Sequence, residues 1–97
     1  MLERLNKMQA DMEAKQEELS LKEYSATAGG GMVEATVNGK HRVLSLAIKP
    51  EVCDPEDTEM LGDMIAAAIN SAIDASTKDY EESMSQLTGG LNIPGMM

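Results

Sequence analysis

One short run between two helix-like segments constrains the fold most strongly. It covers residues 29–48 and centres on Asn38-Gly39, with alternating apolar and polar residues on both sides. Asn-Gly between two such segments is a strong hairpin signal, because a two-residue type I′ turn needs positive φ at both positions. Residues 40–42, Lys-His-Arg, follow the turn. The pattern predicts a tight hairpin with charge at its tip, which favours a contact surface over a catalytic pocket.

The hairpin belongs to a predicted three-stranded sheet. Strands are expected over about residues 20–28, 32–37 and 40–49, where alternate residues are apolar. In the second and third strands one face carries Val33, Ala35, Val37, Leu44, Leu46 and Ile48. The opposite face carries Met32, Thr36, Val43 and Ala47, which makes it partly apolar. Such a sheet has more apolar surface than a single helix can cover.

Residues 2–19 predict the first helix, since they contain no Gly or Pro and are rich in good helix formers. An apolar heptad seam runs along it, interrupted by Lys15, and consists of Met1, Leu5, Met8, Met12 and Leu19. The seam indicates either a partner helix or packing on the sheet of the same chain. Both alternatives remain open from the sequence.

A second helix is expected over about residues 55–86. Asp54 is a candidate cap before Pro55, and the acidic residues that follow favour the positive end of the helix dipole. A broad apolar face suited to a sheet is formed by Leu61, Met64, Ile65, Ala68, Ile69, Ala72 and Ile73. The order helix, three strands, helix predicts an α+β class with an antiparallel sheet. We expect one domain over residues 1–88 and a flexible tail over 89–97.

The residues needed for catalysis or metal binding are largely missing. The chain has one His, His41, and one Cys, Cys53, which the pattern places on different elements without an orienting partner. One His and one Cys do not make a zinc site, and no calcium-loop spacing or dinucleotide fingerprint occurs. We expect no enzyme activity, no small-molecule substrate and no cofactor. A single Cys and the lack of a long apolar run favour a cytoplasmic protein without a membrane span.

Charge is unevenly distributed along the chain. The net charge is −9, but residues 29–53 hold three basic and two acidic side chains, whereas residues 54–97 hold one basic and nine acidic ones. The hairpin segment is therefore the one part that is not acidic. On charge alone, nucleic-acid binding is not predicted, because phosphate contacts depend on Lys and Arg. The basic side chains could equally serve only to keep the protein soluble.

The ordered motifs resemble the YbaB/EbfC family of nucleoid-associated proteins over nearly the whole chain. The resemblance rests on residues 8–13 (MQADME), 33–39 (VEATVNG), 46–50 (LAIKP), 59–72 (EMLGDMIAAAINSA) and 90–96 (GLNIPGM). It implies a tweezer-shaped homodimer that binds double-stranded DNA with little sequence preference and acts in nucleoid organisation or gene expression.

On this basis we expect a cytoplasmic protein of the nucleoid. The phosphate contacts are assigned to Lys40 and Arg42, with weaker candidates Lys22, Lys49, Arg4 and Lys7. The candidate dimer-interface residues are Leu5, Met8, Met12, Met32 and Val43. The alternative is an acidic protein-interaction module with weak or no DNA binding, in which the second helix meets a basic partner.

Overall fold

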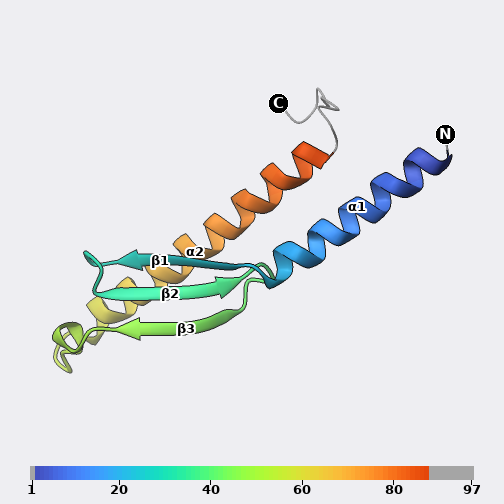
Figure 1. The fold of residues 1–97 in the computed structure, drawn as a ribbon. Helices are drawn as coiled ribbons and strands as arrows, with labels where there is room; N and C mark the ends of the chain where they lie inside the picture. The colour runs from blue at the N-terminus through green and yellow to red at the C-terminus, as the bar shows by residue number, and fades with distance from the viewer. Residues whose placement is uncertain (1, 88–97) are drawn as a thin grey trace.

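The computed structural model describes residues 2–87 (Figure 1). Its elements are α1 (Leu2–Leu21), β1 (Glu23–Ala28), β2 (Val33–Asn38), β3 (Val43–Ile48), the short 3₁₀ helix η1 (Pro50–Val52) and α2 (Thr58–Leu87). The predicted order of helix, three antiparallel strands and helix is therefore confirmed. Met1 and the predicted tail at 89–97 lie outside the described residues.

The fold has two layers, a sheet in the order β1-β2-β3 and the helix α2 packed on one of its faces (Figure 1). Alternate residues of β2 point toward α2, and Val33, Ala35 and Val37 are fully buried there. Ala68 and Ala72 of α2 pack against them, because small side chains let the helix approach the sheet closely. The predicted inward face of β2 and the predicted apolar face of the second helix are confirmed.

The hairpin between β2 and β3 forms, but not with the predicted type I′ turn. His41 N donates to Asn38 O at 2.9 Å and Asn38 N donates to Arg42 O at 3.0 Å, which leaves a three-residue loop. Within this loop only His41 has a positive φ, 63°. A loop of this length usually combines a type I turn with one left-handed residue. The two-residue turn was therefore a wrong prediction, although the hairpin itself was right.

Gly39 is needed for a close contact rather than for its φ. A Cβ at this position would collide with the backbone carbonyl of Leu19, in the last turns of α1. Leu19 is 3% exposed, so the end of α1 is held firmly against the hairpin tip. The missing side chain of Gly39 allows α1 and the hairpin to meet.

Replacing Gly39 with Ala is expected to lower the free energy of unfolding by about 1–3 kcal/mol, the usual range for overpacking a tight contact. Gly62→Ala is a matched control, because a Cβ there meets nothing within 4 Å and Gly62 lies inside α2. We expect Gly62→Ala to be neutral or stabilising, since Ala is the better helix former. Urea unfolding of both variants measures the difference. A Gly39→Ala variant as stable as Gly62→Ala would contradict the close contact.

A β-bulge changes which face part of β3 presents. Thr36 pairs with Ser45, and the next residue, Val37, pairs with Val43, so that Leu44 is an extra residue in β3. Paired residues lie on the same face of a sheet. Val43 therefore lies on the α2 side with Val37, and its predicted place on the opposite face is wrong. The predicted place of Met32 is also wrong, because Met32 precedes β2 and packs against the buried core.

The predicted element boundaries differ from those observed. The predicted first strand began at residue 20, but α1 continues to Leu21, with Ser20 Oγ donating to Glu17 O at 2.7 Å. The predicted third strand was too long by several residues at its start. Asp54 does not cap α2: its carboxylate accepts from Glu56 N at 2.9 Å in a preceding turn. Asp57 caps the helix instead, accepting from Met60 N at 3.3 Å.

Candidate nucleic-acid interface

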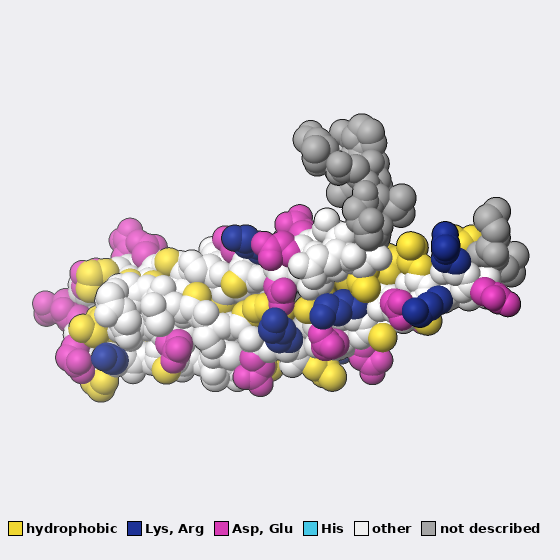
Figure 2. All heavy atoms as spheres, turned by 45° about the horizontal axis from the view of Figure 1, so that its top comes forward, with side chains coloured by type: hydrophobic (Ala, Val, Ile, Leu, Met, Phe, Trp, Pro, Cys, Tyr) yellow, Lys and Arg dark blue, Asp and Glu magenta, His cyan; other side chains and the backbone are white. Residues whose placement is uncertain are grey.

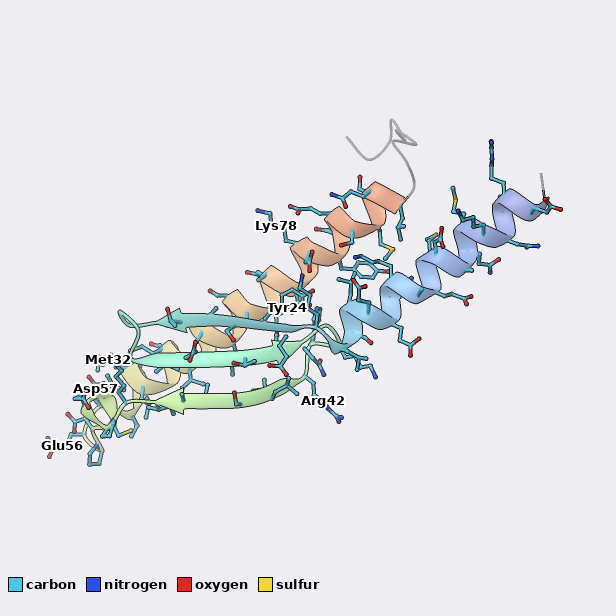
Figure 3. All side chains as sticks on the ribbon, viewed as in Figure 1. Tyr24, Met32, Arg42, Glu56, Asp57 and Lys78 are labelled. Atoms are coloured by element: carbon cyan, nitrogen blue, oxygen red, sulfur yellow. The ribbon has the colours of Figure 1, made fainter. Side chains whose placement is uncertain are left out.

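Three of the predicted basic residues gather at one end of the sheet. The β1–β2 register pairs Glu23 with Asn38, which brings Lys22 beside the hairpin loop that carries Lys40 and Arg42. We call Lys22, Lys40 and Arg42 the hairpin-end cations. Lys40 and Arg42 are exposed, and the side chain of Arg42 extends away from the sheet (Figure 3). The sequence spacing predicted that Lys40 and Arg42 lie close together, and the pairing of β1 with β2 brings Lys22 to the same end of the sheet.

The side chain of Asn38 organises the loop that holds two of these cations. Its Oδ1 accepts hydrogen bonds from the backbone N–H groups of Lys40 at 2.9 Å and Arg42 at 3.1 Å. A short polar side chain that binds nearby backbone groups is the reason Asn favours turns. The loop is also tied to α2, because His41 Nε2 lies 3.4 Å from Thr77 Oγ1. The backbone that positions Lys40 and Arg42 is therefore ordered by local contacts.

Lys22 differs from its two neighbours because it already has a carboxylate partner. Its Nζ lies 2.8 Å from Asp79 Oδ2 on α2, and 5.6 Å from the centre of the Tyr24 ring. The Tyr24 hydroxyl donates to the same Asp79 oxygen at 2.7 Å, and Ser83 Oγ donates to Asp79 Oδ1 at 3.5 Å. Sequence reasoning counted Asp79 only among the acidic residues of the second helix that would meet a basic partner, and missed this contact. No local pattern reports a pair 57 residues apart.

These contacts shift two pKa values in opposite directions. The hydrogen bond from Lys22, followed by that from Tyr24, holds the pKa of Asp79 below its usual range. Burial, followed by the hydrogen bond to Asp79, raises the pKa of Tyr24 to about 12. Both shifts favour the protonation states present at neutral pH, namely ionised Asp79 and neutral Tyr24.

The stability that these groups confer is therefore lost at both ends of the pH scale. A lowered Asp79 pKa stabilises the fold above the ordinary range of Asp, and this stability disappears as the pH falls through the folded pKa. A raised Tyr24 pKa stabilises the fold below the ordinary range of Tyr, and this stability disappears as the pH rises toward about 12.

We expect the free energy of unfolding of Tyr24→Phe to fall less at alkaline pH than that of the parent, measured by urea unfolding between neutral pH and pH about 11. Identical alkaline profiles would refute the assignment.

The remaining predicted cations do not join the hairpin end. Lys49 follows β3 at the opposite end of the sheet, about 23 Å from Arg42 at roughly 3.3 Å per residue. Arg4 and Lys7 lie toward the start of α1, with Arg4 about 22 Å from Leu19 at 1.5 Å per residue. Figure 2 shows basic side chains spread along one face and mixed with acidic ones. The structure thus supports one cluster and several separate cations.

An apolar surface lies beside the cluster, on β3. α2 packs on β1 and β2, so the α2-facing side of β3 extends past the edge of the helix (Figure 1). Val43, Leu44 and Leu46 are 45%, 46% and 38% exposed. We call these three residues the β3 strip. Large aliphatic side chains side by side in solvent are typical of an interface.

The other predicted interface residues are placed differently from one another. Leu5 of α1 is 65% exposed, whereas Met8 and Met12 are half-buried. α1 projects past the sheet alongside the second half of α2, and Gln16 Nε2 donates to Tyr80 OH at 3.2 Å between them (Figure 1). Met32 is partly buried against the core of its own chain. Of the five predicted interface residues, Leu5 and Val43 are the exposed ones.

The residues considered for chemistry are far apart. Cys53 is exposed after η1, at one end of β3, and His41 precedes the other end of that strand. Among residues 2–87, no three His, Cys, Asp or Glu side chains are grouped so that they could hold a metal ion. In the same described range, no helix has both the length and the apolar character needed to span a membrane.

The chain is similar to known proteins over most of its length. The model of the YbaB/EbfC DNA-binding family matches residues 1–91. A nucleoid-associated protein of Alkaliphilus metalliredigens is 49% identical over 96 residues, covering 99% of this chain and 84% of the relative. One from Clostridium kluyveri has the same identity and coverage. A third, from Clostridium acetobutylicum, is 47% identical and covers 99% of this chain and 86% of the relative.

A solved structure supports the fold independently. The crystal structure of an uncharacterized protein from Helicobacter pylori superposes with a TM-score of 0.74, covering 88% of this chain and 89% of that chain. The two sequences are 22% identical in the superposition. At this low identity the likeness concerns the arrangement of helices and strands alone.

Proposed function

The chain belongs to the YbaB/EbfC DNA-binding family, and from this premise we propose that it is a nucleoid-associated homodimer that binds double-stranded DNA through phosphate contacts. The observation that carries the proposal is the ordered hairpin tip, with Lys40 and Arg42 both exposed and held by Asn38. Exposed Lys and Arg side chains suit phosphate oxygens, and the ordered backbone beneath them reduces the conformational freedom that the loop loses on binding.

A homodimer is supported by the β3 strip. Apolar side chains at a sheet edge lose solvent exposure when two copies meet, and a 97-residue chain buries a modest core by itself. The strip begins next to Arg42, so joining two copies there brings two hairpin tips into one assembly. Two copies supply four tip cations from Lys40 and Arg42. The assembly then has a local concentration of positive charge for DNA, even though the net charge is −9 per chain.

Little sequence preference follows from the type of contact. Phosphate contacts position a protein on DNA but carry no direct sequence information. The chain has no Phe or Trp, and both Tyr side chains are engaged in hydrogen bonds. Stacking on unpaired bases therefore contributes little, which favours duplex over single-stranded DNA.

The proposal is tested by fluorescence anisotropy with two duplexes of unrelated sequence and one single strand of equal length. We expect binding to both duplexes with affinities that differ by less than about tenfold, well short of the roughly 10³ or more typical of specific sites. We expect weaker binding to the single strand. Absence of binding to both duplexes at low salt would overturn the proposal.

The alternative partner is a basic protein that meets the acidic face of α2. Asp74, Glu81 and Glu82 are exposed on that helix. Co-purification of one stoichiometric basic protein, without DNA and without duplex binding by the pure chain, would favour this alternative.

A further inference from the structure

The ion pair at the hairpin end has a consequence for DNA binding. Of the three hairpin-end cations, Lys22 has a carboxylate against it, Asp79 at 2.8 Å. Within residues 2–87, no hydrogen bond or ion pair joins the side chains of Lys40 and Arg42 to an acidic group. The side chain of Lys22 is still 54% exposed, and the side chain of Asp79 is 28% exposed. A phosphate could therefore approach Lys22, but it would meet a pair with no net charge.

Asp79 is held in place without help from Lys22. Tyr24 OH donates to Asp79 Oδ2 at 2.7 Å from β1, and Ser83 Oγ donates to Oδ1 at 3.5 Å from the next turn of α2. Tyr24 is 9% exposed, so its hydroxyl is a fixed donor. A carboxylate anchored in this way does not swing out when an anion approaches. It stays beside Lys22 and opposes that anion.

The second charged pair at the junction lies mainly apart from this contact, since the hydrogen bond to Glu18 is the main cause that raises the pKa of Lys15 and Asp79 is the weakest. Lys15 Nζ lies 2.7 Å from Glu18 Oε2 on α1, so each of these charges is balanced within its own helix. The charge of Lys22 is thus balanced chiefly by Asp79. An ion pair near the surface contributes little to stability, so removing one partner frees the other at little cost.

We infer that Asp79 is an internal competitor of DNA phosphate for Lys22, so that Lys22 is withheld from DNA for as long as Asp79 carries its charge. This inference rests on the proposed function, because it concerns the affinity of the hairpin end for DNA. Asp79 acts on DNA binding through Lys22 and does not touch DNA.

The test compares the affinity of a random duplex for the parent, Asp79→Asn and the matched control Asp74→Asn. Both variants remove one carboxylate from α2, but Asp79 contacts Lys22, whereas Asp74 is exposed and lies about 7.5 Å before Asp79 along the helix. We expect Asp79→Asn to bind roughly three- to tenfold tighter, and the slope of log affinity against log salt to steepen by about 0.9 for each freed Lys. We expect Asp74→Asn to change affinity by about twofold or less, because salt screens a distant charge.

Two further variants separate Lys22 from the general charge effect. Adding Lys22→Gln to Asp79→Asn is expected to abolish the gain, and Asp79→Glu, which keeps the charge, is expected to retain the parental affinity. The inference is overturned if Asp79→Asn binds no tighter than Asp74→Asn, or if the gain survives in the double variant.

A comparison that leaves Asp79 intact guards against misfolding of the Asp79→Asn variant. Lys22→Gln in the parent is expected to weaken duplex binding less than Lys40→Gln, and equal losses would overturn the inference. The parent reports on the proposed function separately. If the parent shows no salt-dependent binding, the proposed function fails and the inference with it. If the parent binds and the Asp79 variants behave as the control, only the inference fails.

Discussion

Lys40→Glu/Arg42→Glu is expected to reduce the affinity for duplex DNA by at least about 100-fold at moderate salt, because each copy replaces two proposed phosphate contacts with two repulsive charges. Both side chains are exposed at the hairpin tip, and their backbone N–H groups, not their side chains, make the loop contacts with Asn38. The variant should therefore keep its fold and its thermal stability. Anisotropy titration gives the affinity, and circular dichroism checks the fold.

Two single variants provide the matched comparison. Lys40→Glu changes one exposed Lys at the hairpin tip, and Lys78→Glu, the control, changes one exposed Lys elsewhere. Lys78 extends from α2 on the side of the molecule away from Arg42 (Figure 3). We expect Lys40→Glu to weaken binding much more than Lys78→Glu. Equal losses would mean that DNA responds to total charge, and the assignment of the hairpin tip would be wrong.

Placing a carboxylate on the β3 strip is expected to separate the proposed homodimer into folded single copies. In Leu44→Asp each dimer would bury two unpaired charges at the interface, which should weaken association by about 100-fold or more. Leu44 is 46% exposed, so the single copy tolerates the change. Sedimentation equilibrium measures the outcome as a fall from twice 10.4 kDa to 10.4 kDa. Duplex binding should weaken in parallel, because one copy supplies half of the tip cations.

Leu21→Asp is the control for this second variant. Leu21 is 71% exposed at the end of α1, outside the strip, so the same change there should leave the dimer intact. If Leu44→Asp and the parent sediment alike, the β3 strip is not the interface. Association would then have to use another surface, such as the seam of α1 that includes Leu5.

The sequence predicted those parts of the fold that depend on local periodicity. Alternation in β2 identified Val33, Ala35 and Val37 as the inward face, and helical spacing identified Ala68 and Ala72 on the helix that covers them. Asn-Gly correctly located a hairpin. It did so for a different reason than expected, because Gly39 makes room for Leu19 of α1.

The errors concern features that hydrophobic periodicity does not report. The extra residue at Leu44 moves Val43 to the other face. In a six-residue strand, the alternation of apolar and polar residues does not reveal a bulge of this kind. Asp57, not Asp54, caps α2, since both acids precede the apolar face and only the backbone path decides between them. The same limitation applies to the candidate site.

Within the candidate site, the closeness of Lys40 to Arg42 was predictable because the two residues stand two positions apart at the hairpin. Their contact with DNA stays a prediction. The partnership of Lys22 with Asp79 was not, since it joins β1 to α2 across the packed layers. The spread of Lys49, Arg4 and Lys7 also follows only from the arrangement of the elements. A list of basic residues in the sequence therefore overstates the cluster that DNA could contact.

The most direct test of the account is the salt dependence of duplex binding by the parent protein. With about four phosphates neutralised per dimer, by Lys40 and Arg42 of each copy, log affinity should fall with log salt at a slope of roughly −3.6. A slope near this value, lost in Lys40→Glu/Arg42→Glu, is the predicted result. A slope of zero would contradict the claim that the hairpin tips bind DNA through its phosphates.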